Sequence, residues 1–340
     1  MSSIPGLMLM QYTIRHLTRF QYTDPITESV TEVRMQPRST DYQQCSMFRL
    51  NVRPAAQLQT YVDHLENTVH HFTQPGLHQT LAITAESEVV VQPRPVPPAA
   101  LSEDAWQQLD GMSDNDMFWE MLAPSDYTAR SPALDALAEE LQVWRRRDPL
   151  SQLYELNSAL HRTFAYDGKS TRVDSPIDDA LAHRRGVCQD FAHIMLALVR
   201  NHLQIPCRYV SGYLYHRRDD RSVDGATHAW LDVLLPGLGW VGFDPTNNLL
   251  AGERHIEVAI GRDYHDVPPT RGVYKGNAGS DLSVVVRVRT AHDRHQESDG
   301  APDAEAGEAV PYHSSEKALQ ARYAQALLAM QMQQQQQQQQ

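Results

Sequence analysis

The sequence predicts an α+β protein in which a small all-β sandwich precedes a core of helices followed by an antiparallel sheet. Strand-like runs fill residues 11–94, whereas residues 148–291 begin with helical periodicity and continue with strands. The proline-rich run at 93–100 separates the two patterns, because proline lacks a backbone donor and fixes its own torsion. We therefore expect a sandwich domain at 11–94, a helical linker region at 95–147, a core at 148–291 and a tail at 292–340.

The strands of the first region are indicated by alternation and by turn residues. Segments 12–20, 47–52 and 81–85 alternate apolar with polar residues or are rich in strand formers. Asp24-Pro25 is a turn signal between two such runs. The pattern is typical of an antiparallel β domain.

The helices of the second region are indicated by their starts. Three begin where an N-cap residue precedes proline, at Ser131-Pro132, Asp148-Pro149 and Ser175-Pro176. A further helix is expected from Cys188 to about Leu203, where apolar residues recur at helical spacing. Strands are expected after it, at 207–216, 227–235, 240–244 and 282–289.

The tail differs in composition from the rest of the chain. Residues 292–308 are acidic and poor in large apolar side chains, so they cannot offset their ordering entropy by burial and are expected to be disordered. Residues 314–340 carry apolar residues at helical spacing before a polyglutamine run, which predicts a frayed terminal helix. We assign the tail no chemistry.

Charge and cysteine usage narrow the partners and the compartment. A net charge of -12 argues against the broad basic surface that nucleic-acid binding needs. No stretch approaches the roughly 20 apolar residues of a membrane span, so we expect no membrane partner. The cysteines are odd in number and widely spaced, which indicates free thiols in a reducing compartment, and we expect a cytoplasmic protein. They are Cys45, Cys188 and Cys207.

Cys188 is the first candidate for chemistry. It opens a predicted helix, where unpaired backbone donors and the helix dipole favour an anion. The thiolate is the form of cysteine that attacks carbonyl groups. A cysteine at a helix start is also compatible with a buried structural residue, so the downstream sequence decides between the two.

The downstream sequence places a histidine and an aspartate on one predicted hairpin. The run at 236–239, Pro-Gly-Leu-Gly, is a turn signal between the two strands. A turn centred on Gly237 places His228 opposite Thr246, with Asp244 as the diagonal neighbour on the same face. A register centred between two residues would put His228 and Asp244 on opposite faces.

Three ordered blocks of the chain resemble the transglutaminase-like superfamily: Gly-Val-Cys-Gln-Asp-Phe-Ala at 186–192, Thr-His-Ala-Trp at 227–230 and Gly-Phe-Asp-Pro-Thr-Asn at 242–247. Over residues 12–276 the chain is most similar to bacterial transglutaminase-like proteins with a β-rich N-terminal region. The resemblance implies a papain-like, transglutaminase-like α+β core.

The same resemblance implies a mechanism. In it Cys188 attacks an amide carbonyl, His228 shuttles the proton and Asp244 orients the imidazole. The product is an acyl-enzyme thioester, which water or an amine then resolves. The expected substrate is a peptide or protein amide, and the enzyme is expected to be a cysteine peptidase or amidase or an acyl transferase.

The oxyanion donors are less defined. The backbone N–H of Cys188 is the natural first donor, and Gln189, Tyr166 and Trp230 are further candidates for the oxyanion site or cleft. Animal-type transglutaminases use a tryptophan upstream of the cysteine, and this chain has no clear counterpart. That difference keeps hydrolysis open beside acyl transfer.

Other polar residues are interpreted structurally. We expect Asp190 to complement the helix N-terminus and His193 to lie on or beside its packed face. Cys188, Cys207, His193 and His228 lack metal-ligand spacing, so neither a metal nor a cofactor is predicted. Two alternatives to the thiol enzyme remain open, a non-catalytic interaction protein that keeps the fold and a zinc-dependent hydrolase.

Overall fold

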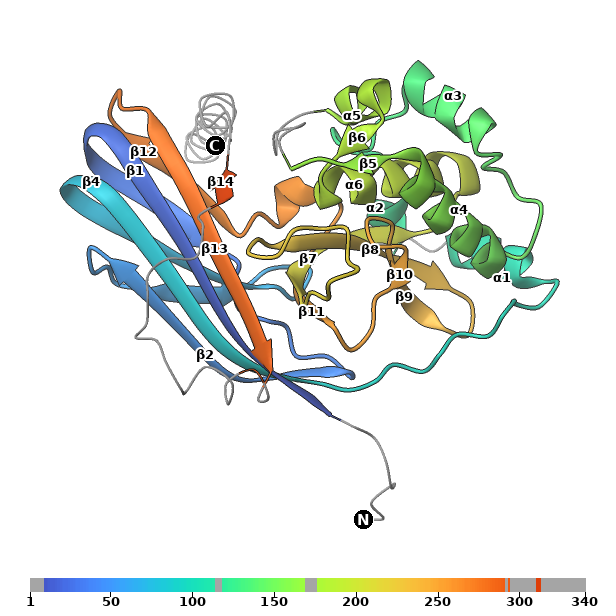
Figure 1. The fold of residues 1–340 in the computed structure, drawn as a ribbon, viewed down its shortest axis with the longest axis horizontal. Coiled ribbons are helices and arrows are strands. Elements are labelled where there is room, and N and C mark those ends of the chain that lie inside the picture. Colours follow the sequence, from blue (N-terminus) through green and yellow to red (C-terminus); the bar gives the residue numbers. More distant parts are fainter. Residues whose placement is uncertain (1–8, 114–117, 169–175, 291–292, 294–309, 313–340) are drawn as a thin grey trace, which may run out of the picture.

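The computed structural model describes residues 9–113, 118–168, 176–290, 293 and 310–312 of the chain (Figure 1). It confirms the α+β class, with a strand-rich first part and helices that precede an antiparallel sheet in the second part. The expected disorder at 292–308, except for Asp293, and the expected helix at 314–340 fall outside the described residues.

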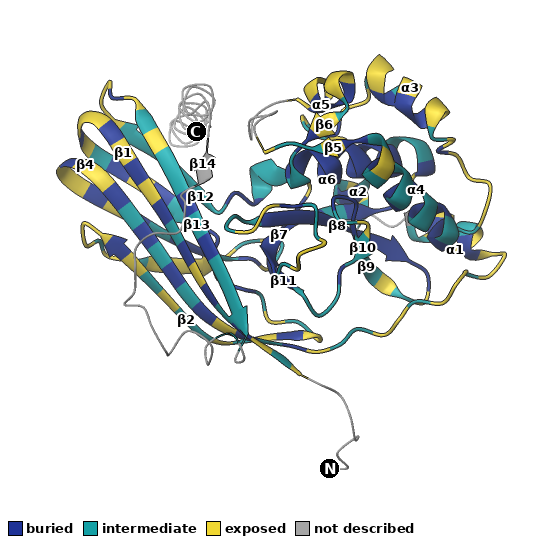
Figure 2. Cartoon of the chain, viewed as in Figure 1, coloured by how far each residue is buried: buried dark blue, intermediate teal, exposed yellow. Residues whose placement is uncertain are grey.

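The first sheet has seven strands, ordered β14-β13-β1-β4-β2, with β12 also paired to β1 and β3 to β4. Along β1 and β4 buried and exposed residues alternate, which Figure 2 shows as stripes. One face of each long strand is therefore buried. The strands are β1 (Met10–Val33), β2 (Gln43–Arg53), β3 (Gln59–Val62), β4 (Thr68–Val91), β12 (Thr270–Lys275), β13 (Ser280–Thr290) and β14 (Val310–Tyr312).

This arrangement corrects two sequence-based expectations. The strands of 11–94 lie in one sheet rather than in two packed sheets, and β12 and β13 belong to that sheet although the core was expected to extend to 291. The physical reason is that β12 and β13 pair with the edge of β1 that β4 does not occupy. Without β12 and β13 that edge would expose unpaired backbone groups over most of its length.

The helices begin largely as predicted. Ser131 Oγ accepts the N–H of Leu134 at the start of α3, and Asp148 accepts the N–H of Ser151 at the start of α4. At α5 the N-cap is Pro176, and Ser175 lies outside the described residues. The helices are α1 (Ala105–Ser113), α2 (Trp119–Leu122), α3 (Pro132–Glu140), α4 (Pro149–Thr163), α5 (Ile177–His183) and α6 (Cys188–Leu198), which continues as the π-helical η2 (Val199–Leu203).

The Asp148 side chain also connects the linker region at 95–147 to the core by a hydrogen bond. Its Oδ1 accepts the N–H of Leu101 at 2.9 Å and that of Ser151 at 3.2 Å. We expect Asp148→Ala to lower the free energy of unfolding by about 1–2 kcal/mol, because two backbone donors lose their acceptor. Denaturant unfolding would measure this. Glu139→Ala, at an exposed position of α3, is the control and should change stability by less than about 0.5 kcal/mol; an equal loss would contradict the cap.

The second sheet has five strands, ordered β10-β9-β8-β7-β11, and lies beside the helices (Figure 1). One face packs Ala229, Leu231 and Val233 of β8 into the same core as the apolar side of α6. The strands are β7 (Cys207–Leu214), β8 (His228–Leu235), β9 (Gly239–Asp244), β10 (Leu249–Leu250) and β11 (His255–Gly261). The remaining elements are the parallel pair β5 (Ala165–Tyr166) and β6 (Arg185–Gly186) and the 3-10 turn η3 (Tyr264–Asp266).

The two sheets share an apolar interface. Tyr213 of β7 and Ile256 of β11 are buried in one cluster with Tyr12 and Ile14 of β1. The first sheet therefore covers the edge of the second sheet that β7 and β11 form. Within the described part of the chain no helix is long and apolar enough to cross a bilayer.

Candidate active site

The β8–β9 hairpin has the register predicted from its turn. Leu231 lies opposite Phe243 and Leu235 opposite Gly239, as a turn centred on Gly237 requires. Gly237 has a φ of 71°, a conformation that costs glycine little. His228 and Asp244 consequently share a face, and His228 Nε2 lies 2.7 Å from Asp244 Oδ2.

Cys188 lies at the start of α6 and is half-buried. Asp190 Oδ2 accepts the N–H of Val187 at 2.8 Å, so it caps the helix as the sequence predicted. A Cβ at Gly186 would lie 2.6 Å from that carboxylate oxygen, which explains the glycine before the cap. The cap thus fixes the backbone around the thiol.

The Cys188 thiol is an electrostatic neighbour of the His228 imidazole, since it raises the pKa of that ring. Since Nε2 of His228 faces Asp244, Nδ1 is the ring nitrogen left for the thiol. Burial lowers the pKa of His228, but the Asp244 carboxylate and then Cys188 raise it, and the balance raises this pKa to about 10. The imidazole therefore carries a proton at neutral pH.

Asp244 is fully buried and accepts five hydrogen bonds. Its Oδ2 accepts from Nε2 of His228, from Nε2 of His255 at 3.2 Å and from Nδ2 of Asn247 at 2.9 Å. Its Oδ1 accepts the N–H groups of Thr246 at 3.1 Å and Asn247 at 3.2 Å. Burial opposes ionisation, but the two histidines outweigh it and hold the pKa of this carboxyl well below its usual range.

His255 is a second histidine on Asp244 that the sequence did not assign. Its Nδ1 accepts the N–H of Gly252 at 3.3 Å, so its Nε2 carries the proton that it donates to Asp244. Burial lowers the pKa of His255, so the ring donates this bond as a neutral imidazole. No local signal identifies it, because β11 reaches the site through its pairing with β7, outside the hairpin.

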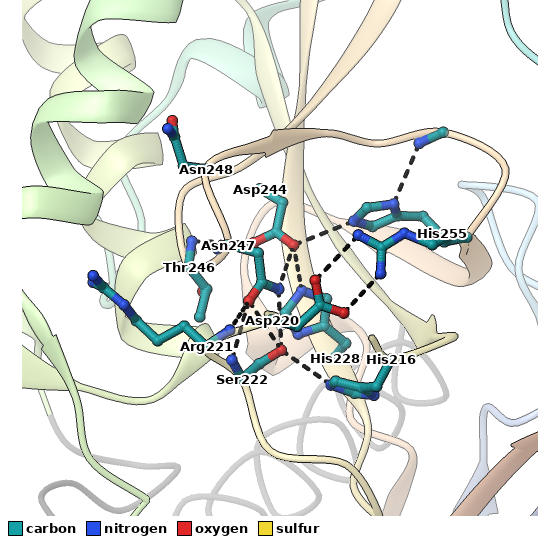
Figure 3. A network of polar contacts seen from close by, with 12 residues as sticks. His216, Asp220, Arg221, Ser222, His228, Asp244, Thr246, Asn247, Asn248 and His255 are labelled. Carbon is teal, nitrogen blue, oxygen red and sulfur yellow. Dashed lines mark hydrogen bonds and ion pairs between the residues drawn. The ribbon is translucent and has the colours of Figure 1, made fainter. Parts of the chain in front are cut away.

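Asn247 links the site to the loop before β8 (Figure 3). Its Oδ1 accepts the N–H groups of Arg221 at 2.8 Å and Ser222 at 3.0 Å, while its Nδ2 donates to Asp244. Ser222 Oγ in turn lies 3.0 Å from Nε2 of His216. The loop and the hairpin are therefore held together by one side chain.

The cleft candidates come from three elements, β8, β5 and α6. Trp230 is fully buried in an apolar cluster with Val210, Ala251 and Ile260, and its ring lies 6.1 Å from that of His228. Tyr166 on β5 lies near the thiol, since burial and then the Cys188 charge raise the pKa of its hydroxyl. Gln189 follows Cys188 on α6 and is nearly buried. Their roles toward an oxyanion stay predictions.

The zinc set drawn from the sequence does not come together. His193 Nε2 accepts the N–H of Tyr264 at 3.2 Å and its ring stacks on Tyr127, as expected for a packed side chain. Cys207 is buried against Leu196. Among the described residues the side chains whose ligand atoms lie within 4.8 Å of one another are His228, Asp244 and His255. In that group Nε2 of each histidine donates its proton to Asp244, as described above.

Two family profiles match the chain. Residues 12–90 match the bacterial transglutaminase-like N-terminal region, and residues 135–245 match the transglutaminase-like superfamily. An uncharacterised protein of Mycobacterium leprae is 35% identical over 276 residues, which cover 80% of this chain and 96% of that protein. An uncharacterised protein of Mycobacterium bovis is 34% identical over 299 residues, which cover 84% of this chain and 95% of that protein.

Two further relatives carry functional descriptions. A protein-glutamine gamma-glutamyltransferase of Pseudomonas aeruginosa is 29% identical over 165 residues, which are 43% of this chain and 24% of that protein. The crystal structure of a candidate cysteine protease from Cytophaga hutchinsonii aligns with a TM-score of 0.65 and 20% identity, covering 90% of this chain and 98% of that one. The structural likeness supports the fold.

Proposed function

Since the chain belongs to the transglutaminase-like superfamily, we propose that it is a cysteine enzyme that acts on peptide or protein amides through a thioester at Cys188. The observation that supports this most strongly is the buried His228, which hydrogen-bonds Asp244 and whose pKa is raised by both Asp244 and the neighbouring Cys188. A nucleophile, a base and an orienting acid in that order are what thiol acyl chemistry requires.

The proposed first half-reaction uses the proton already held by His228. The Cys188 thiolate attacks the carbonyl carbon, a C–S bond forms, and the developing oxyanion accepts the backbone N–H of Cys188. His228 then gives its proton to the leaving nitrogen as the C–N bond breaks. The products are a free amine or ammonia and a thioester at Cys188.

The second half-reaction reverses the role of the imidazole. Neutral His228 removes a proton from water or from an acceptor amine, whose oxygen or nitrogen attacks the thioester and releases the thiolate. Water gives a hydrolase and an amine gives a transferase. The residues at the site serve both outcomes equally, so the acceptor is the property to measure.

Glutamine peptides are the first substrates to test, because the named Pseudomonas relative is a protein-glutamine gamma-glutamyltransferase. The protein would be incubated with a glutamine peptide and a labelled primary amine, before and after dialysis against a strong chelator, and the products weighed by mass spectrometry. Amine incorporation indicates transfer and conversion to glutamate indicates hydrolysis. Activity that disappears with the chelator and returns with zinc would instead favour the zinc-dependent alternative.

His255 is proposed to position Asp244, and through it His228. His255→Phe keeps a ring in the same space but removes the donor to Asp244, so we expect kcat/KM to fall by roughly 10- to 100-fold with little change in KM. His255→Gln, which can still donate, should recover part of the loss. A purely structural role would lower the yield of folded protein and leave kcat per folded molecule unchanged in both variants.

A further inference from the structure

The outer face of the first sheet carries a groove of about 320 Å³ with arginines along its sides. The groove faces away from the second sheet, because the alternate residues Tyr12 and Ile14 of β1 fill the interface with that sheet. Glu86 is its one acidic lining residue. The arginines are Arg15, Arg19, Arg49, Arg53 and Arg287.

The pairing register arranges the lining residues, together with Ser283, in three rows across four neighbouring strands, β13, β1, β4 and β2. The first row is Arg287, Arg15, Glu86 and Arg49. The middle row is Val285, Leu17, Thr84 and Asn51, and the third is Ser283, Arg19, Ala82 and Arg53. The outer rows lie roughly 13 Å apart and the four strands span about 14 Å. The result is a short trough with a partly apolar floor between two positive walls.

The positive charge of the trough is poorly balanced. Arg15 and Arg49 share Glu86, at 3.7 and 3.9 Å. Arg19, Arg53 and Arg287 form no ion pair with any residue that the structure describes. Arg15 also lies directly opposite Arg287, and like charges in directly opposed positions destabilise a sheet. An anionic ligand would relieve this repulsion.

We propose that the trough binds an acidic peptide segment, with carboxylates on the arginine walls and aliphatic stems over Leu17 and Val285. The planar guanidinium matches a carboxylate with two parallel hydrogen bonds. About four extended residues fit the length of the trough. No aromatic ring lines it to stack a base, and the chain's net charge of -12 repels a long polyanion beyond its ends. A short acidic peptide fits these conditions better than nucleic acid does.

The test is binding of a fluorescent hexaglutamate peptide to the full chain, followed by anisotropy, with hexaglutamine as the uncharged peptide. We expect hexaglutamate to bind with an affinity that falls as the salt concentration rises, and hexaglutamine not to bind. Arg19→Gln/Arg53→Gln should weaken it by about tenfold or more. The matched control is Arg162→Gln/Arg218→Gln, which removes the same charge at exposed positions outside the trough and should change affinity by less than about twofold.

Several results would overturn the proposal. Two of them are equal weakening of hexaglutamate binding by both double variants and equal binding of hexaglutamine by the wild type. A third is tighter binding of a sulfated oligosaccharide than of hexaglutamate through the same arginines. Hexaglutamate binding that appears only after the acidic residues of 294–308 are neutralised would assign the trough to the chain's own tail instead. Binding does not depend on the reaction at Cys188, so Cys188→Ala should bind hexaglutamate as the wild type does.

Discussion

Replacement of Cys188 by alanine is expected to lower kcat/KM for amide substrates by on the order of 10⁴-fold or more, because no other group can form the thioester. Labelling by a thiol-directed acyl probe should disappear at the same time. Cys188→Ser should retain substrate binding but react far more slowly, since a hydroxyl is a weaker nucleophile beside the same imidazole. Steady-state kinetics and probe labelling measure the two effects independently.

Cys45 offers a matched control for the loss of one thiol. It is half-buried on β2 and its Sγ donates to the carbonyl of Met47, and burial raises its pKa. Cys45→Ala should therefore leave turnover and probe labelling unchanged. Turnover that survives Cys188→Ala would favour the zinc-dependent alternative over the thiol enzyme, whereas a wild type without turnover on any amide would favour the non-catalytic one.

Asp244→Asn is expected to lower kcat/KM at neutral pH by roughly 10³- to 10⁴-fold. The amide keeps the shape of the side chain but removes the negative charge that outweighs burial at His228. Without that charge the pKa of His228 should fall from about 10 to below its ordinary value of about 6.5. The pH at which activity is lost on the alkaline side of the profile should fall accordingly. The activity of the variant relative to the wild type should therefore increase as the pH falls.

Asp244→Asn is also expected to change how the stability of the protein depends on pH. A histidine whose folded pKa exceeds its unfolded value stabilises fully below the unfolded value, and the contribution is lost as the pH rises through the folded one. For His228 that window runs from about 6.5 to about 10. The stability gap between wild type and Asp244→Asn should be largest near pH 5–6 and shrink toward pH 10. Asp219→Asn, in the exposed neighbouring loop, should show neither this change nor a shifted pH profile.

Local sequence signals predicted the hairpin because its geometry is local. The turn at Gly237 sets the register, and the register alone brings His228 and Asp244 to one face. The N-caps at Ser131 and Asp148 were predictable for the same reason, since a cap and its partner are three residues apart. What a few neighbouring residues determine can be read from the chain directly.

Features that depend on distant pairing were not predictable in this way. His255 reaches Asp244 because β11 pairs with β7 on the far side of the second sheet. β13 joins the first sheet beside β1, although more than half of the chain separates them. The arginine trough requires the register of four strands at once. No periodicity within one segment specifies any of these.

The most direct test of the proposed chemistry is to identify the acylated residue. Wild-type protein would be mixed with an activated ester of a glutamyl peptide, so that deacylation limits the rate, quenched in acid and analysed by intact mass and peptide mapping. We predict one acyl group per chain, bound to Cys188, that disappears when water or an added amine is given time to react. Turnover of the ester with no adduct at Cys188, or an adduct at another residue that forms equally in Cys188→Ala, would contradict the account.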